Sequence, residues 1–146
     1  MAIRDSLVLT DDQRALRDLV RGFLADQLAS DSLRAMINAE PGYSPELHAR
    51  LATGLGLAGL TIPEEFGGRG LSQADAGVVH TELGHALYPG PFLPSALAAG
   101  VLLAATGDAA AHGPMNADGA AAAKRWLPLL ADGSVVVFNG RFNSVS

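Results

Sequence analysis

The sequence predicts an all-α fold, an orthogonal or up-and-down bundle of about five to six helices with one orphan β-strand at its C-terminal end. Apolar residues recur at helical spacing through most of the chain, which is typical of helices that bury one face. The period changes only after Gly133, where residues 134–138 form a short β-branched run. We therefore expect a helical domain over residues 1–133 and a truncated β-segment with a divergent tail over residues 134–146.

The first helix is predicted by its cap and its apolar stripe. Thr10 and Gln13 have capping-box spacing, in which each side chain bonds the backbone amide of the other residue. Asp11 and Asp12 follow at the positive end of the helix dipole. We expect the helix to fade near Ser30. Its apolar face comprises Leu16, Leu19, Val20, Phe23, Leu24 and Leu28.

Capping residues and prolines place the remaining helices. Ser44 followed by Pro45, and Ser72 followed by Asp75, are helix-start signals. The loop over residues 107–119 is rich in Ala and Gly and is expected to be mobile. The later helices are expected to start at Ser32, Ser44, Ser72, Pro94 and Ala120.

Two connectors, residues 57–72 and 82–95, are rich in glycine and proline yet strongly apolar. Surface loops are usually polar, so we expect both connectors to pack against other parts of the protein. Glu64 and Glu65 are interpreted as a solvated turn or a cap, because neighbouring carboxylates in a turn do not converge like an acid/base pair. The glycines that follow lack the Lys-Ser/Thr ending of a phosphate-binding loop and predict a tight connector. They are Gly67, Gly68 and Gly70.

The composition excludes several classes of function. With 10 basic and 15 acidic residues the net charge is -5, and no basic stripe for nucleic acid is present. The absence of cysteine excludes disulfides, thiol catalysis and thiolate metal sites. The N-terminal residues do not resemble a targeting peptide, and the longest apolar run is too short to span a bilayer. We expect a cytoplasmic protein with no membrane span.

The chain resembles the acyl-CoA dehydrogenase family in four segments that follow the family's order: LTDDQRALRDLVRGFLA, GLAGLTIPEEFGGRGLS, VVHTELGHALYPGPFLPS and KRWLPLLADGSVVV. The resemblance covers residues 9–137 and is greatest to bacterial subunits in which a PGPFLPS-type loop follows the third helix. It stops after Val137, where FNGRFNSVS differs from the family's next strand. A truncated or frame-shifted reading frame would produce such a tail, and so would a cut at the domain edge with foreign residues added. It implies a protein of three parts, with this helical domain before a β-domain and a C-terminal bundle.

The resemblance also implies a reaction. Family members bind FAD between the last two parts and oxidise an acyl-CoA to the trans-2-enoyl-CoA, as a glutamate removes the α-proton and the β-hydride passes to the flavin. Electrons then pass to an electron-transfer flavoprotein, and the complete enzyme is expected to be a homo- or hetero-oligomer. The base and the flavin motif lie outside the matched segments. No catalytic, cofactor-binding or metal-binding residue is therefore assigned, and these 146 residues alone are expected to hold no FAD and show no turnover.

An acyl-chain pocket is the one site that the resemblance implies here, against the third helix, the loop after it and the next helix. Apolar side chains in such a pocket select substrates by size, since each buried methylene contributes about 1 kcal/mol. That these residues only fill the core remains an alternative, and the acyl group stays open between straight-chain, branched and steroid types. The pocket residues implied are Leu87, Gly90, Phe92, Leu93, Leu97 and Gly100.

Other candidate residues have structural interpretations. His80 and His85 are five residues apart, which places them on different helix faces and does not suit a shared metal ion. His85 is expected to pack or hydrogen-bond near the end of its helix, and His48 and His112 to lie on the surface. Trp126 is interpreted as a core anchor rather than a ring that stacks on a flavin.

Two alternatives to the enzyme domain remain open for the chain as a whole. It could be a non-catalytic helical interaction module, or a partner subunit that completes a dehydrogenase with another chain. The apolar connectors and the predicted lone strand suit these alternatives as well.

Overall fold

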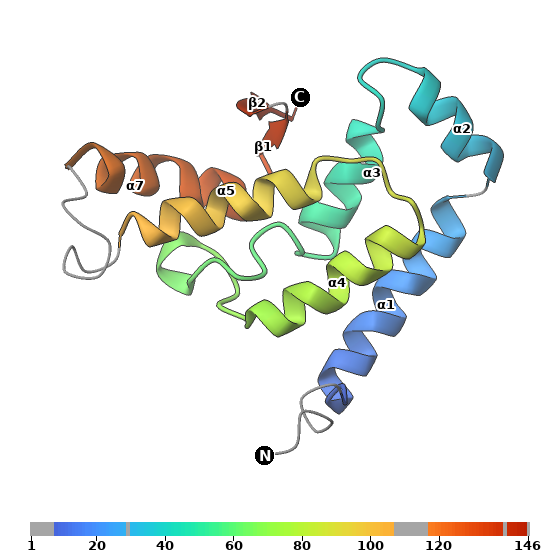
Figure 1. The fold of residues 1–146 in the computed structure, drawn as a ribbon, viewed down its shortest axis with the longest axis horizontal. Coiled ribbons are helices and arrows are strands. Elements are labelled where there is room, and N and C mark those ends of the chain that lie inside the picture. The colour runs from blue at the N-terminus through green and yellow to red at the C-terminus, as the bar shows by residue number, and fades with distance from the viewer. Residues whose placement is uncertain (1–7, 29, 107–116, 139, 146) are drawn as a thin grey trace. The chain divides into compact units, whose positions relative to one another are not determined.

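The computed structural model forms two compact units along the chain, and Figure 1 traces its elements in order. Unit 1 comprises residues 1–42 and 73–89, and unit 2 comprises residues 43–72 and 90–146. Helices dominate, and the sheet in the described part of the chain has two strands, which confirms the predicted fold class. The residues that the structure describes are 8–28, 30–106, 117–138 and 140–145.

Unit 1 is built on two helices that pack along each other, α1 (Asp11–Gln27) and α4 (Gln73–His85), with α2 (Ser30–Asn38) following α1. The predicted capping box is present: Gln13 N–H donates to Thr10 Oγ1 at 3.2 Å, and Thr10 N–H donates to Gln13 Oε1 at 3.1 Å. The Gln13 side chain also donates to Asp75 Oδ1 at 2.9 Å, which joins the first turns of α1 and α4.

The apolar face of α1 is covered less widely than its pattern predicts. Val20 and Leu24 are fully buried, whereas Leu19 is 52% exposed. Leu16, Phe23 and Leu28 are half-buried. A single neighbouring helix covers only a narrow strip of a helix surface, and within unit 1 that neighbour is α4.

Unit 2 places two further helices side by side, α5 and α7, with a small sheet against both (Figure 1). Its elements are α3 (Pro45–Ala49), a π-helical turn (Arg50–Gly54), a 3-10 turn (Glu64–Phe66), α5 (Phe92–Ala104), α7 (Ala117–Ala131), β1 (Val135–Phe138) and β2 (Arg141–Ser144). One cluster of its buried core comprises Ile62, Ala99, Ala123, Leu127, Leu130, Val135 and Val137.

Helix boundaries differ from the predictions by a few residues. The helix α5 begins at Phe92 rather than at Pro94, and α7 begins at Ala117 rather than at Ala120. The helix α2 begins at Ser30. The loop predicted to be mobile falls mostly at residues 107–116, which lie outside the described residues, and its last three residues belong to α7.

The first connector packs inward, as its apolar composition predicts. Leu57, Leu60 and Ile62 are buried, and its backbone folds back on itself through hydrogen bonds. Arg69 N–H donates to the Gly59 carbonyl at 2.8 Å, and Leu71 N–H donates to the Leu60 carbonyl at 2.9 Å. These bonds confirm the predicted tight connector.

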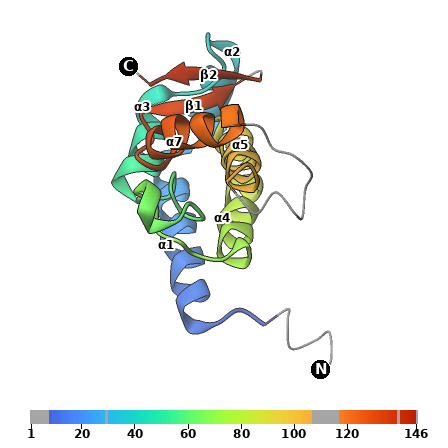
Figure 2. The ribbon, with the colours of Figure 1, turned by 90° about the vertical axis from the view of Figure 1, so that its left-hand side faces the viewer.

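The prediction of an orphan strand is wrong in one respect, because β1 has a partner. Strand β2 pairs with it antiparallel, with Val135 opposite Ser144 and Phe138 opposite Arg141 (Figure 2). All four residues of β2 are exposed and most are polar, so no apolar pattern marks the strand. The sequence signal that was missed is the Asn139-Gly140 dipeptide between the strands, which favours tight hairpin turns.

None of the helices in the described residues is both long enough and apolar enough to span a membrane.

Candidate functional site

The helix α5 presents an exposed apolar face at the positions implied for the acyl pocket. Leu93 and Leu97 are 53% and 62% exposed, and Val101, one turn further on, is 71% exposed. Gly100 lies on the same face, and a Cβ atom built on it would meet nothing within 4 Å. We call Leu93, Leu97, Gly100 and Val101 the α5 apolar face.

The remaining pocket residues lie in different surroundings. Phe92 is only 7% exposed, at the first position of α5, and Gly90 just before it is half-buried. Leu87 follows α4, is 69% exposed and has a φ of 53°, in the left-handed region that non-glycine residues rarely adopt. Leu87 belongs to unit 1 and the α5 residues belong to unit 2.

Phe92 is held by a line of rings that runs through unit 2. Its ring centroid lies 5.8 Å from that of His48, which lies 6.1 Å from that of Tyr43. Tyr43 in turn lies 5.6 Å from Phe138 at the end of β1. We call Phe138, Tyr43, His48 and Phe92 the aromatic row. It joins the start of α5 to β1 through His48 of α3 and through Tyr43, which lies just before α3.

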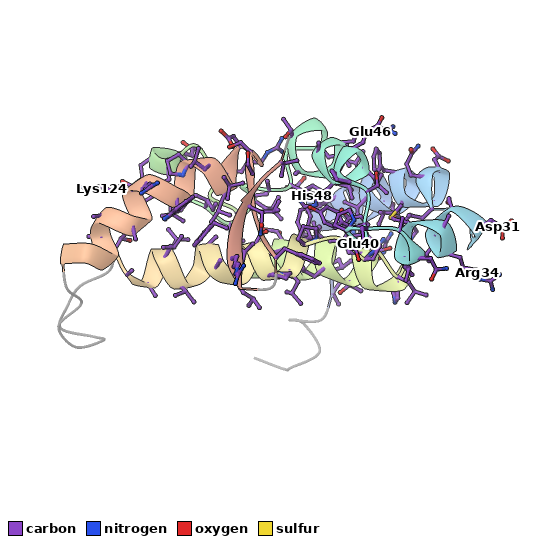
Figure 3. The ribbon with its side chains drawn as sticks, turned by 90° about the horizontal axis from the view of Figure 1, so that it is seen from above. Asp31, Arg34, Glu40, Glu46, His48 and Lys124 are labelled. Carbon is purple, nitrogen blue, oxygen red and sulfur yellow. The ribbon has the colours of Figure 1, made fainter. Side chains whose placement is uncertain are left out.

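The prediction that His48 lies on the surface is wrong, because its side chain is 2% exposed and contacts the rings of Tyr43 and Phe92. Figure 3 shows it within a dense group of side chains. Burial lowers the pKa of His48 from 6.5 to about 4, so the ring is neutral at pH 7. A helix as short as Pro45–Ala49 carries too little periodicity to assign its faces from sequence. His112 lies outside the described residues.

An ion pair lies between α1 and α4 in unit 1, with the Glu82 side chain buried and the Arg21 side chain 56% exposed. Glu82 is 4% exposed and accepts two hydrogen bonds from Arg21, from Nε and from a terminal nitrogen, each at 2.9 Å. The Arg21 hydrogen bond lowers the pKa of Glu82, against the effect of burial, which raises it. A carboxylate stabilised in this way is a weak base, so its role here is to join two helices.

A cavity of about 230 Å³ adjoins this ion pair. His85, near the end of α4 as expected, places its Nδ1 atom 3.9 Å from Glu82 Oε1. Apolar side chains from both helices form the rest of the wall. The full lining is Arg21, Leu24, Ala25, Leu28, Glu82, His85 and Ala86.

The other residues considered as candidates are either exposed or have partners within the chain. Glu64 and Glu65 are exposed in the 3-10 turn. The Trp126 ring stacks on Phe142 of β2 with centroids 4.4 Å apart, and the Arg125 guanidinium lies 4.8 Å from the Trp126 centroid. His80 Nδ1 lies 2.8 Å from the carbonyl oxygen of Ala76. No group of three or more metal-ligating side chains occurs in the described ranges.

The chain was compared with known protein families. Residues 10–134 match the family model described as "Acyl-CoA dehydrogenase, N-terminal domain". This match covers most of the chain.

Two curated relatives align with about two thirds of this chain. The chain is 41% identical over 95 residues to "Acyl-CoA dehydrogenase IpdE2" of Mycolicibacterium smegmatis, and 40% identical over 95 residues to the protein of the same name from Mycobacterium tuberculosis. Each alignment covers 65% of this chain and 30% of the relative, so the chain spans less than a third of the relatives' length.

A solved structure has the same fold. The chain matches a variant of the "Tcur3481-Tcur3483 steroid ACAD" with a TM-score of 0.69 and 27% sequence identity. This match covers 86% of this chain and 31% of the other chain.

Proposed function

This chain belongs to the acyl-CoA dehydrogenase family, and we propose that it acts as the N-terminal helical domain of a flavin-dependent enzyme. That enzyme would oxidise an acyl-CoA between its α and β carbons and release the trans-2-enoyl-CoA. The domain would supply part of the wall around the acyl group, and other parts of the enzyme would supply the base and the flavin.

The observation that supports this proposal most directly is the α5 apolar face. Large apolar side chains left in water lose the stabilisation that burial would give, about 25 cal/mol for each Å². Leu93, Leu97 and Val101 are each more than half exposed and adjacent on one helix. A contiguous exposed apolar patch is typical of a surface that a ligand or another protein surface covers. An acyl group laid along α5 would cover these side chains.

Gly100 gives this face a shape that selects among acyl groups. A Cβ atom built on Gly100 would meet nothing within 4 Å, so the glycine leaves open space beside Leu97 and Val101. Open space at this position suits a wide or rigid acyl group as well as a linear one. The structural neighbour is named a steroid ACAD, which supports a steroid acyl group as the first substrate to test.

The glycine-rich loop and the Trp126 ring both have partners within the chain. A phosphate-binding loop needs free amides, yet those of Gly67, Gly68 and Gly70 donate to the carbonyls of Glu64, Pro63 and Ile62 within the loop. The Trp126 ring is already engaged by Phe142 and Arg125. We therefore expect these 146 residues alone to bind no flavin and to show no turnover.

A second arrangement is that this chain completes a dehydrogenase together with a separate chain. The name of the structural neighbour favours it, because that name joins two designations for one steroid ACAD. Either arrangement includes an oligomeric enzyme, an electron-transfer flavoprotein as electron acceptor and a cytoplasmic location.

The experiment compares two preparations. The first is the native assembly, which is the affinity-tagged chain purified from its native host together with all covalently or stably attached protein. The second is the isolated 146-residue chain. Each is given a steroid acyl-CoA or octanoyl-CoA, with electron-transfer flavoprotein as acceptor, and enoyl-CoA is measured by mass spectrometry. We expect flavin absorbance and product in the native assembly and neither in the isolated chain.

Two outcomes would contradict parts of this proposal. Flavin absorbance in the isolated chain would contradict the assignment of the flavin to other parts of the enzyme. A native assembly that has no flavin and forms no enoyl-CoA from either substrate would contradict the dehydrogenase function and favour an interaction module.

A further inference from the structure

The Ser95 hydroxyl joins two segments that are distant in the chain. Ser95 lies in the first turn of α5, and its hydroxyl donates to the Pro91 carbonyl at 2.7 Å. The same oxygen accepts a hydrogen bond from Val137 N–H of β1 at 2.9 Å. A hydroxyl has one proton and two acceptor positions, so both bonds form at once. Ser95 therefore ties β1 to the turn of α5 that carries Leu93 and Leu97.

The backbone N–H of Val137 points away from β2, so it needs a hydrogen-bond acceptor outside the hairpin. In the hairpin, the Ser134 carbonyl accepts from Val145 N–H at 2.9 Å, which identifies the pairs that bond across the ladder. Bonded and non-bonded pairs alternate in an antiparallel ladder, so Val137, opposite Phe142, directs its N–H to the outer edge. Val137 is only 8% exposed, and a buried amide without an acceptor costs free energy. Ser95 supplies the acceptor that a third strand would otherwise supply.

The aromatic row connects the same two segments by a second route. Phe92 begins α5 and Phe138 ends β1, and both are linked through the rings of His48 and Tyr43. The two links lie three residues apart on α5, at Phe92 and Ser95, and on neighbouring residues of β1, at Phe138 and Val137. Two such links fix both the distance between the segments and the rotation of the first turn of α5.

We propose that Ser95 is a positioning residue for the acyl site, one that holds the start of the α5 apolar face in place against β1. This inference rests on the proposed function of that face. Leu93 and Leu97 lie within two residues of Ser95 on the same helix, so a shift of Ser95 moves both side chains. The same hydroxyl would then determine how closely the wall approaches the acyl group.

The first test measures the link on the 146-residue chain. Ser95→Ala removes the acceptor, and Ser95→Thr retains it. Amide hydrogen exchange followed by NMR reports on Val137 and on residues 96–99 of α5. We expect Ser95→Ala to lower the protection of both groups by about tenfold, and Ser95→Thr to restore it. Thr81→Ala is the matched control, because Thr81 makes the same type of bond, to the Gly77 carbonyl at 2.8 Å, within α4.

Three results would overturn the inference: unchanged protection of α5 in Ser95→Ala, a failure of Ser95→Thr to restore it, or an equal loss in Thr81→Ala. If Ser95→Ala does not fold, Ser95→Cys takes its place, since a thiol has similar size and is a weak acceptor. An intermediate loss of protection at Val137 and in α5 would support the inference. An absence of any loss would overturn it.

The second test uses the assembly purified from the native host and steady-state kinetics with the better acyl-CoA substrate. A displaced wall weakens acyl binding, so we expect Ser95→Ala to raise KM more than it lowers kcat, and Ser95→Thr to restore KM. A lower kcat with an unchanged KM in Ser95→Ala would overturn the positioning role. Failure of the wild-type assembly to oxidise acyl-CoA would instead overturn the proposed function, while the exchange result would still decide whether Ser95 links the two segments.

Discussion

At the residue scale, His48 makes unit 2 sensitive to acid. The folded protein holds His48 neutral, with a pKa lowered to about 4, whereas the unfolded chain binds a proton near pH 6.5. Because the unfolded state then binds more protons, the free energy of unfolding falls as the pH drops from 6.5 to 4. The full loss from this residue is about 3 kcal/mol. His48→Phe should remove this part of the pH dependence, measured by urea unfolding at several pH values.

Leu127→Ala is the control for this prediction, because Leu127 lies in the core of unit 2 and carries no titratable group. It should leave the slope between pH 6.5 and 4 unchanged. A His48→Phe variant with the slope of the wild type would show that burial of His48 does not govern the acid sensitivity.

The Arg21–Glu82 pair predicts a second effect with its own pH dependence. Arg21→Met leaves the Glu82 carboxylate buried without its main partner, so the melting temperature at pH 7 should fall. Glu82 has a lowered pKa in the folded state, so its stabilisation is present above its ordinary pKa and is lost as the pH falls. The difference from the wild type should therefore shrink in acid.

Arg14→Met provides the comparison for Arg21→Met. Arg14 pairs with Asp11 at the exposed start of α1, and exposed pairs add little stability. Equal melting temperatures for the two variants would contradict the importance of the Arg21–Glu82 pair.

At the scale of elements, the first connector is fixed by close backbone contacts at Gly68. A Cβ atom at this position would overlap the carbonyl group of Ile62, which is part of the core of unit 2. Gly68→Ala should therefore lower the free energy of unfolding by about 2 kcal/mol, measured by urea denaturation. Gly77→Ala in α4 is the matched control, because its Cβ would meet nothing within 4 Å, and it should raise stability by up to about 1 kcal/mol. Similar values for both variants would contradict this account.

Elements whose signals are local could be predicted from the sequence. The start of α1 follows from Thr10 and Gln13, and the start of α3 follows from Ser44, whose hydroxyl accepts from Leu47 N–H at 3.1 Å. Strand β2 could not be predicted from hydrophobicity, because it buries no residue and depends on pairing with β1. The π-helical turn at Arg50–Gly54 had no sequence signal that we identified.

The candidate site could be predicted only in part, because some of its contacts join segments that are distant in the chain. The resemblance to the family implied Leu93, Leu97 and Gly100 as pocket residues, and the structure places these three on one exposed face of α5. The burial of His48 and the bond between Ser95 and Val137 join segments more than 40 residues apart, as the 42-residue separation of that bond illustrates. Contacts of this range are set by packing, which a local pattern does not report.

At the scale of the whole molecule, the chain forms only part of the proposed enzyme. It spans 30% of the length of the curated relatives described above. On the proposed function, the α5 apolar face is completed by parts of the enzyme outside these residues. This view predicts that a side chain added to that face changes substrate selection without harming the fold.

The most direct test of this central claim is acyl-CoA selectivity in the assembly purified from the native host. Gly100→Leu adds a side chain where the structure has open space, and Gly77→Leu adds one to α4 at a position equally open. We predict that Gly100→Leu lowers kcat/KM for a bulky acyl-CoA relative to a short one by at least about tenfold, whereas Gly77→Leu leaves the ratio unchanged. An unchanged ratio in Gly100→Leu, with normal folding and flavin content, would contradict the assignment of the α5 apolar face to the acyl site.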